Sequence, residues 1–202
     1  MTDIVIQKGD TFSRVERLSL ETLPFIYKAI TAITKASPVA ITSAGHGLTA
    51  DWRVAVVSAG GMRQINAKNF PPRATDFHKA IITSSSIIAL NDVNSADYTT
   101  YTSGGSLVYY TPRSLASCTA RLQIRATATA ADPALVSLTS PSGGIVLDDT
   151  AHTITITIAA TVTAAYTFYT GVYDLELVTG DATPVVTKLL SGNVTVLDEV
   201  TR

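Results

Sequence analysis

The chain has 202 residues and a formal net charge of −1 at pH 7, a length that suits one large all-β unit or two small domains. Charged residues make up 15% of the chain and hydrophobic residues 46%, so Thr, Ser, Ala and Gly must form much of the surface. The sequence has no basic block and no run of about 18 apolar residues, which argues against nucleic-acid binding and against a membrane-spanning helix.

The first residues and the cysteine content indicate the compartment. The start, MTDIVIQKGDTF, lacks a cationic segment followed by an apolar one, so no secretion signal is expected. Cys118 is the single cysteine and cannot form an internal disulfide. Synthesis in a reducing cytoplasm is therefore expected.

The first half of the chain consists of short β-rich runs separated by Gly, Pro, Asn and Asp. Residues 11–20 allow two interpretations, because Phe12, Val15 and Leu18 have helix-like spacing while the Ser and Thr content indicates a bulged strand. The runs AITAITKASPVAITSAGHGL, RVAVVSAGG, KAIITSSSIIAL and GGSLVYY follow. Their spacing of about 8–12 residues predicts a β-sandwich or a β-barrel.

Alternation of apolar and polar residues predicts strands in the second half of the chain. CTARLQIR, residues 118–125, places Leu122 and Ile124 on one face and its arginines and glutamine on the other. HTITITI, residues 152–158, sets isoleucines against threonines in the same way. The Ala-rich stretch between them contains Pro133 and is expected to bend between strands.

The last strands follow the same pattern. In YDLELVTGDATPVVTKLLSGNVTV, residues 173–196, the apolar residues of YDLELV face one way and Asp174 and Glu176 the other. TGDATP has turn chemistry, and SGN predicts a second turn before a last strand, VTV. We therefore expect an antiparallel meander at the end of the chain.

The histidines and serines do not form a catalytic or metal-binding pattern. His46, His78 and His152 lack metal-ligand spacing and a cysteine partner, so no zinc site is expected. His46 lies in AGHGL and is expected to hydrogen-bond to loop backbone, whereas His152 is expected to be exposed. Ser84–Ser86 are more typical of a polar hairpin than of a nucleophile, since no G-x-S-x-G occurs.

One thiol and four carboxylates remain as candidates for catalysis. The alternation places Cys118 on the apolar face, which favours a buried, inert thiol. Asp174 and Glu176 share a face at about 6.5–7 Å, from a strand rise of about 3.3 Å per residue, and with Asp148 and Asp149 they suggest a glycosidase pair. Solvated strands carry such carboxylates routinely. We predict no catalytic, cofactor-binding or metal-binding residues, and a protein that is not an enzyme.

A set of short motifs lies between residues 29 and 110. The set comprises Pro38-Val39 with Thr42, His46-Gly47-Leu48, Gly60-Gly61-Met62 with Asn66 and Phe70, and Tyr101-Thr102-Ser103-Gly104-Gly105. This segment resembles a small β module of tailed-bacteriophage tail and structural proteins, often labelled by its similarity to a catalytic-cysteine half-domain of ubiquitin-activating enzymes. Asp51-Trp52-Arg53 departs from the pattern, which usually has a Gly-containing turn there. No ATP-binding module accompanies it and Cys118 lies outside it, so the enzymatic label is not carried over.

Both ends of the chain carry a second resemblance. The stretch QKGD at residues 7–10 and the stretch RLQIR at residues 121–125 resemble two strands of an immunoglobulin-like sandwich of phage baseplate-upper and tail-associated proteins. In that pattern the two strands follow each other directly. The resemblance therefore implies an immunoglobulin-like β-sandwich of residues 1–28 and 112–202, with a small β-barrel-like domain, residues 29–111, inserted in a loop.

The two resemblances imply a non-enzymatic structural component of a tailed-phage virion, in the tail, the baseplate or a fibre anchor, assembled in the host cytoplasm. Its partners would be other virion structural proteins and copies of itself, with no nucleic acid, membrane or cofactor. Thr-rich and Ala-rich faces would supply contacts with few charges to desolvate. Two alternatives are a capsid decoration protein and a carbohydrate-binding host-surface module, for which Tyr109–Tyr110 and Tyr166–Tyr169 are the candidate aromatic residues.

Overall fold

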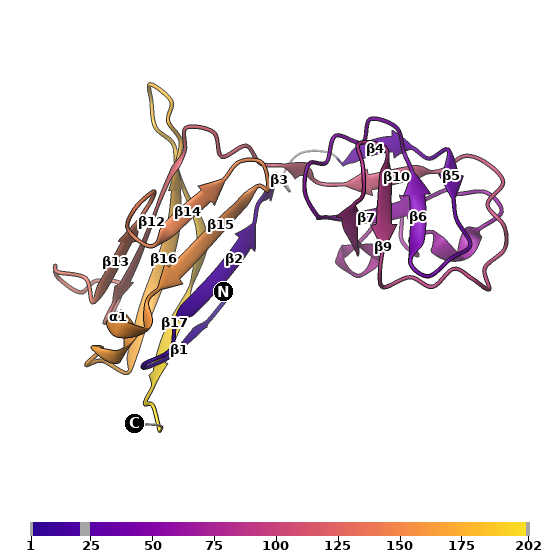
Figure 1. Ribbon diagram of the computed structural model, residues 1–202. Coiled ribbons are helices and arrows are strands. Elements are labelled where there is room, and N and C mark those ends of the chain that lie inside the picture. The colour runs from indigo at the N-terminus through magenta and orange to yellow at the C-terminus, as the bar shows by residue number, and fades with distance from the viewer. Residues whose placement is uncertain (1, 21–24, 201–202) are drawn as a thin grey trace. The chain divides into compact units, whose positions relative to one another are not determined.

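The computed structural model describes residues 2–20 and 25–200, and its regular structure is almost entirely strand (Figure 1). Strands account for 44% of the structure and helices for 6%, which confirms the all-β class predicted from the alternation. Contacts between Cα atoms divide the chain into two compact units. The first combines Met1–Leu18 with Ser114–Arg202, and the second is Ser19–Arg113.

The first unit is a sandwich of two sheets. The five-stranded sheet has the order β1 (Ile4–Gln7), β17 (Val186–Leu197), β16 (Thr170–Val178), β12 (Thr119–Arg125) and β13 (Val136–Thr139). The three-stranded sheet has the order β14 (Ile145–Asp148), β15 (Thr153–Ile158) and β2 (Phe12–Arg17). The three-stranded sheet groups β2 with β14 and β15, and the five-stranded sheet groups β12 with β16 and β17, as in an immunoglobulin-like sandwich. The second unit occupies the connection between β2 and β12.

Each sheet of the sandwich turns its apolar residues toward the other sheet, as the alternation predicted. The buried set includes Leu122, Ile124, Ile154, Ile156, Ile158, Tyr173, Leu175 and Leu177. The threonines between the isoleucines face outward, although Thr153 is also buried. Burial contributes about 1.5–3 kcal/mol per large side chain, so this core is the main source of the sandwich's stability.

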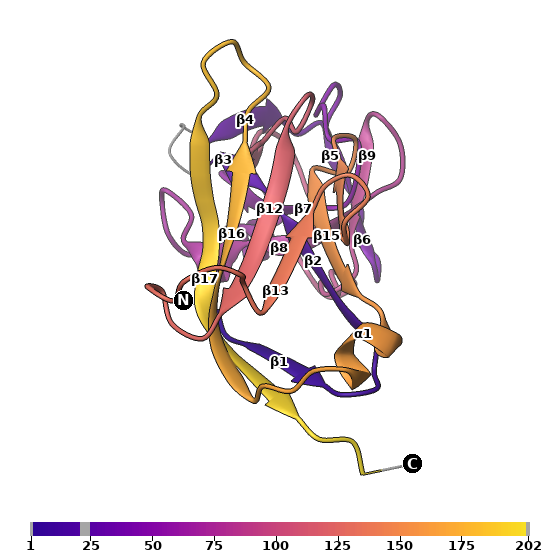
Figure 2. The same cartoon turned by 90° about the vertical axis from the view of Figure 1, so that its left-hand side faces the viewer.

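The chain ends in a two-stranded hairpin, which corrects the predicted meander. β16 and β17 are joined by a loop at residues 179–185, as TGDATP indicated, but SGN continues the strand and Gly192 pairs with Tyr173. A Cβ on Gly192 would lie 2.6 Å from the carbonyl oxygen of Thr2. Glycine is therefore required by a close backbone approach and not by a turn. β17 has β16 on one side and the parallel strand β1 on the other (Figure 2).

Residues 12–17 form a strand, so the helical interpretation of this stretch is wrong. β2 pairs along its whole length with β15, which supplies the backbone partners that an isolated amphipathic turn would lack. A helix that the sequence analysis did not predict, α1, spans Ala160–Ala164. Its alanines favour a helix, whereas its two threonines and its valine do not. The hydroxyl of the buried Thr163 donates to the Asp10 carbonyl at 2.8 Å, so α1 is fixed against the loop that precedes β2.

The second unit is a small β-barrel. Its seven-stranded sheet has the order β4 (Ile26–Ala29), β10 (Ser106–Tyr109), β7 (Trp52–Val57), β8 (His78–Ile82), β9 (Ile87–Leu90), β6 (Val39–Thr42) and β5 (Ala32–Ile33). The two outermost strands, β4 and β5, are separated along the chain by Ile30 and Thr31, whose N–H groups donate to Gly105 and Thr42 at 3.1 and 2.9 Å. One bent segment thus closes both edges of the sheet. Two 3₁₀ turns, η1 (Arg63–Ile65) and η2 (Ala74–Asp76), lie between β7 and β8.

Residues of the barrel's sequence motifs shape its backbone. The side chain of Asn66 accepts from the Ala59 N–H at 2.8 Å and donates to the Ala59 carbonyl at 3.1 Å. Tyr101 donates to the Ile30 carbonyl at 3.0 Å. Gly105 has a φ of +87°, and a Cβ there would lie 2.8 Å from the Ala59 Cα, so only glycine fits. These motif residues are therefore determinants of the fold.

The sequence analysis predicted unit boundaries after residue 28 and before residue 112. The structure places both boundaries elsewhere. Ile26 pairs with Tyr109 in the barrel sheet, so residues 26–28 belong to the barrel. Ser19 pairs with Pro112 where β3 (Ser19–Leu20) meets β11 (Thr111–Pro112). Composition does not mark the first boundary, because β-rich sequence lies on both sides of it, whereas the composition shift near Pro112 lies close to the second boundary, after Arg113.

Replacement of residues 19–113 by a short Gly/Ser linker is expected to leave a folded sandwich. The described residues of the sandwich core all come from residues 4–18 and 115–196. Paired residues such as Ser19 and Pro112 lie about 5 Å apart, so the chain ends that flank the deleted segment, Leu18 and Ser114, are close enough for a short linker. Far-UV circular dichroism and urea unfolding would measure the result. In the shortened chain, Leu122→Ala should lower the free energy of unfolding by about 2–5 kcal/mol. A shortened chain without cooperative unfolding would contradict independent folding of the sandwich.

Gly192→Ala is expected to lower the free energy of unfolding by about 1–3 kcal/mol, as overpacking does, because the new methyl group must displace the Thr2 backbone. Ser191→Ala is the control on the same strand. Urea unfolding of both variants measures the difference. If Gly192→Ala proved no less stable than Ser191→Ala, the N-terminal segment would not be held against β17.

Candidate functional site

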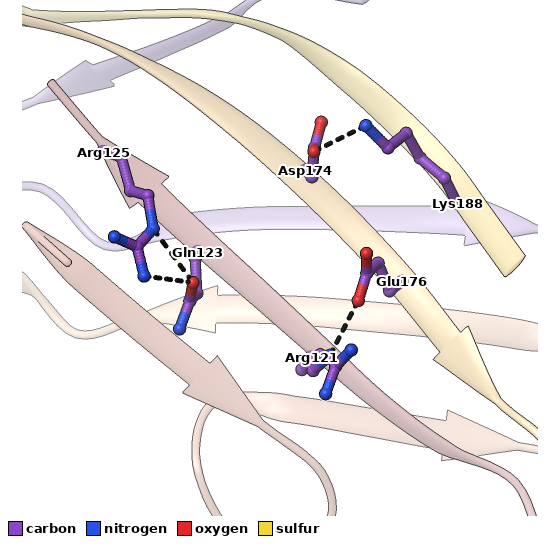
Figure 3. A network of polar contacts seen from close by, with 6 residues as sticks. All are labelled: Arg121, Gln123, Arg125, Asp174, Glu176 and Lys188. Carbon is purple, nitrogen blue, oxygen red and sulfur yellow. Dashed lines mark hydrogen bonds and ion pairs between the residues drawn. The ribbon is translucent and has the colours of Figure 1, made fainter. Parts of the chain in front are cut away.

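Outward-facing polar side chains line a groove of about 550 Å³ on the five-stranded sheet. Figure 3 shows six of them, which come from β12, β16 and β17: Arg121, Gln123, Arg125, Asp174, Glu176 and Lys188. The alternation that buries Leu122 and Leu175 forces their neighbours outward. Which of these side chains meet is then decided by the register of the strands.

The antiparallel register brings opposite charges together across the sheet. Arg121 pairs with Glu176 in the register, and its Nε lies 2.7 Å from the Glu176 Oε2. The Lys188 Nζ lies 2.6 Å from the Asp174 Oδ2, next to a bulge between Leu175 and Glu176. Exposed ion pairs contribute little to stability. Their effect here is to fix where the charged side chains lie.

Arg125 joins the groove to the loop after β12. Its Nε and Nη2 donate to the Gln123 Oε1 at 3.2 and 3.0 Å, and its Nη1 donates to the Ala130 carbonyl at 2.9 Å. The Nη2 also pairs with the carboxylate of Asp132. Ala128, in the same loop, lines the groove. Arg125 therefore orients the Gln123 amide and holds one wall of the groove.

Asp174 and Glu176 share the outer face, as predicted, but do not converge on one point. Asp174 turns toward Lys188 on β17 and Glu176 toward Arg121 on β12, on opposite sides of β16 (Figure 3). The hydrogen bond to Asp174, together with its charge, raises the pKa of the Lys188 ammonium. A lysine that acts as a base or nucleophile requires the opposite shift. The groove therefore presents fixed, internally paired charges.

Asp148 and Asp149 hold turns. The Asp149 Oδ1 accepts from the N–H groups of Leu115 and Ala116 and from the hydroxyl of Ser114. The hydrogen bond from the Leu115 N–H, above all, lowers the pKa of the Asp149 carboxyl, whereas a general acid requires a raised one. Asp148 accepts from the Ala151 N–H at 2.9 Å in the turn before β15. Both carboxylates have structural roles.

The three histidines lie apart, two in the barrel and one in the sandwich. The buried His46 is hydrogen-bonded to loop backbone, as predicted: its Nε2 donates to the Ser84 carbonyl at 2.9 Å and its Nδ1 accepts from the Leu48 N–H at 3.1 Å. The Nδ1 of His78 lies 2.8 Å from the Asp92 Oδ2. His152 is half-buried and not exposed as predicted, because its carbonyl accepts from the Leu18 N–H and ties the turn to the sandwich.

The tyrosine pairs singled out as candidate sugar platforms lie in different units. Tyr109 is 2% exposed in the barrel core. Tyr110 stacks on Phe77, with ring centroids 5.5 Å apart. Tyr169, in the sandwich, is 54% exposed and has the Lys8 Nζ 4.2 Å above its ring. Each of these rings has its contacts within its own unit.

Asp76 organises the loop before β8, a role that the sequence analysis missed. Its carboxylate accepts from the N–H groups of Lys68 and Arg73 at 3.1 and 2.8 Å and from the Asn69 Nδ2 at 2.9 Å. The hydrogen bond from Arg73 is the largest cause of the lowered pKa of Asp76. The turn-rich sequence KNFPPRATD suggests a loop, but the loop contacts that converge on this carboxylate become visible only in the fold.

Cys118 packs against the sandwich core, on the apolar face as predicted, but it is half-buried and not fully buried as expected. Within residues 2–20 and 25–200, no group of three or more His, Cys, Asp or Glu side chains is placed to hold a metal ion. The same part of the chain contains no helix long and apolar enough to cross a membrane. Neither a protein-family model nor a curated protein matches the sequence.

Asp149→Asn is expected to destabilise the protein at neutral pH and to have less effect in acid. The folded-state pKa of Asp149 lies below the ordinary value of 3.8, so its ionised form stabilises the fold above that pH, and the stabilisation is lost as the pH falls through the folded-state pKa. Urea unfolding midpoints measured between pH 7 and pH 2.5 test this. Ser114→Ala, which removes one donor and keeps the charge, should have a smaller effect. Parallel pH curves for Asp149→Asn and the native protein would contradict the anchoring role.

Proposed function

We propose that the protein is a non-enzymatic structural component of a tailed-phage virion, placed in the tail, the baseplate or a fibre anchor. It works by assembling with other virion proteins and with copies of itself. The observation that carries the proposal is the discontinuous architecture, in which one sandwich is built from both ends of the chain and a barrel is inserted between β2 and β12. The resemblance to phage sandwich and tail modules implies the same nesting.

The roles of the motif residues support this proposal. A module used for its shape has its characteristic residues in turns and backbone contacts, whereas a module used for a reaction has them around a substrate. Asn66, Tyr101 and Gly105 fix the backbone of the barrel. The residues that carry the resemblance are thus explained by the construction of a small rigid barrel.

The surface chemistry also favours an assembly role. Charged residues are scarce, at 15% of the chain, and the threonines of β15 alternate with its buried isoleucines. A face of this kind can be covered by another protein with few ions to desolvate. In a symmetric particle, one such face serves every copy.

Immunogold electron microscopy of phage particles tests the proposal. Antibodies against the recombinant protein, applied to particles from cultures that carry the gene, are expected to label the tail or the baseplate. Antibodies pre-absorbed with the pure protein are the control. Label on the head would replace the tail position by capsid decoration. Unlabelled particles, in a lysate that contains the free protein, would overturn the virion proposal.

A further inference from the structure

The outer face of the three-stranded sheet has a simple composition. The register sets three rows across its strands: Arg17–Thr153–Asp148, Val15–Thr155–Val146 and Ser13–Thr157. We call this surface the Thr–Val face. Ile154, Ile156 and Ile158 lie on the opposite side of the same strand and are buried, so the position of the face is fixed by the sandwich core.

The middle row of the Thr–Val face is apolar and open to solvent. Val15 and Val146 are 59% and 57% exposed, on either side of the half-buried Thr155. Adjacent strands lie about 4.8 Å apart, so the two valines and the threonine form one strip about 10 Å across. Covering this strip removes apolar surface from water and desolvates no charge.

The charges of the Thr–Val face lie in one row, on opposite edges. Arg17 is on β2 and Asp148 on β14, both are exposed, and Thr153 separates them. Each also hydrogen-bonds to the backbone of Ala151, which holds the charge at its edge of the sheet. From one edge of the sheet to the other, this row therefore runs from positive to negative. A second copy can match the pattern only if its own row runs the other way.

The outer face of the five-stranded sheet has a different pattern, with one sign of charge on each strand. Arg121 and Arg125 lie on β12, Asp174 and Glu176 on β16, and Lys188 on β17. A twofold axis along β16 would set its carboxylates against the same carboxylates of a second copy, and β12 against β17. Like charges would then oppose each other, so stacking of this face on itself about its central charged strand is disfavoured.

We propose that the Thr–Val face is a contact surface for a second copy of the chain, related by a twofold axis along β15. Rotation about this axis places β2 of each copy over β14 of the other, so Arg17 opposes Asp148 and Val15 opposes Val146, each twice. An axis across the strands would instead place the charged row over the uncharged row of Ser13 and Thr157. Charge complementarity therefore selects one aligned sheet-on-sheet packing.

The size of the face sets the strength of the contact. Three strands and about five residues along each give a footprint of roughly 14 by 17 Å, well below the roughly 800 Å² per partner of a stable complex. The contact is therefore weak between free molecules. It becomes effective where other contacts hold copies close together, and in this respect it rests on the proposed function, since a virion supplies that proximity.

Chemical cross-linking tests the face in the full chain. In a Cys118→Ser background, Thr155→Cys places a thiol on the proposed axis, and Gln123→Cys places one on the five-stranded face as the matched control. A short bis-maleimide suits the reaction because packed sheets lie about 10 Å apart. At high protein concentration, Thr155→Cys is expected to form dimers about tenfold faster than Gln123→Cys, because the contact raises the effective thiol concentration.

Further variants connect the dimers to the named contacts. Val15→Lys with Val146→Lys should slow the cross-linking of Thr155→Cys to the control rate, because lysines would have to be buried. Arg17→Asp should slow it as well, and addition of Asp148→Arg should restore the rate because opposite charges again face each other. Circular dichroism verifies that each variant is folded. Equal rates for Thr155→Cys and Gln123→Cys, or no rescue by the double charge reversal in folded protein, would overturn the contact.

The cross-linking and the particle labelling can fail independently. Selective Thr155→Cys dimers together with unlabelled particles would support the contact surface and overturn the virion role. Labelled particles without selective dimers would support the virion role and overturn the contact surface.

Discussion

Strand pairing across the inserted barrel is the constraint on which the sandwich depends. β2 has to pair with β15, where Phe12 lies opposite Ile158, and β1 has to pair with β17, where Ile4 lies opposite Val194. Such non-local pairs form only after a large loss of chain entropy. The barrel reduces this loss. Its two connecting segments pair with each other at Ser19 and Pro112, so the chain leaves the barrel close to where it entered. The sandwich can then form as if β2 and β12 were joined by a short loop.

Two edge regions of the sandwich, β2 and the part of β17 beyond the end of β1, carry features that oppose further strand pairing. Among the described residues, β2 pairs with β15 alone, and Arg14 and Glu16, an ion pair at 2.5 Å, alternate with its outward residues and point inward. Inward charges on an edge strand disfavour the addition of another strand. On β17, beyond the end of β1, the outward-facing Lys188 and the neighbouring bulge also disfavour the addition of a strand. These two edge regions are therefore poor sites for pairing with a strand of another molecule.

The sequence predicted which face of a strand is buried better than it predicted where the turns lie or which strands pair. A sheet buried on one side imposes a period of two, so the inward positions of Leu122 and Leu175 could be predicted locally. Gly192 could not, because the backbone that requires a glycine there comes from the other end of the chain. The same holds for the groove: that Arg121 and Glu176 face outward follows from alternation, but that they meet follows from the register of two strands separated in sequence. The resemblance suggested an insertion, yet the pairing of Ile26 moved its boundary.

The two outer faces of the sandwich expose different chemistry to solvent: paired charges on the five-stranded sheet and apolar side chains on the three-stranded sheet. On the five-stranded face the charges are neutralised within the chain, and Arg125 is further engaged with the Ala130 carbonyl and Asp132. Another protein that covered this face would have to desolvate existing ion pairs without adding new ones. On the three-stranded face, Val15 and Val146 lose only unfavourable hydration when they are covered. If the proposed contact forms, the difference between the two faces sets its direction: the five-stranded face is already paired within the chain, and the three-stranded face exposes Val15 and Val146.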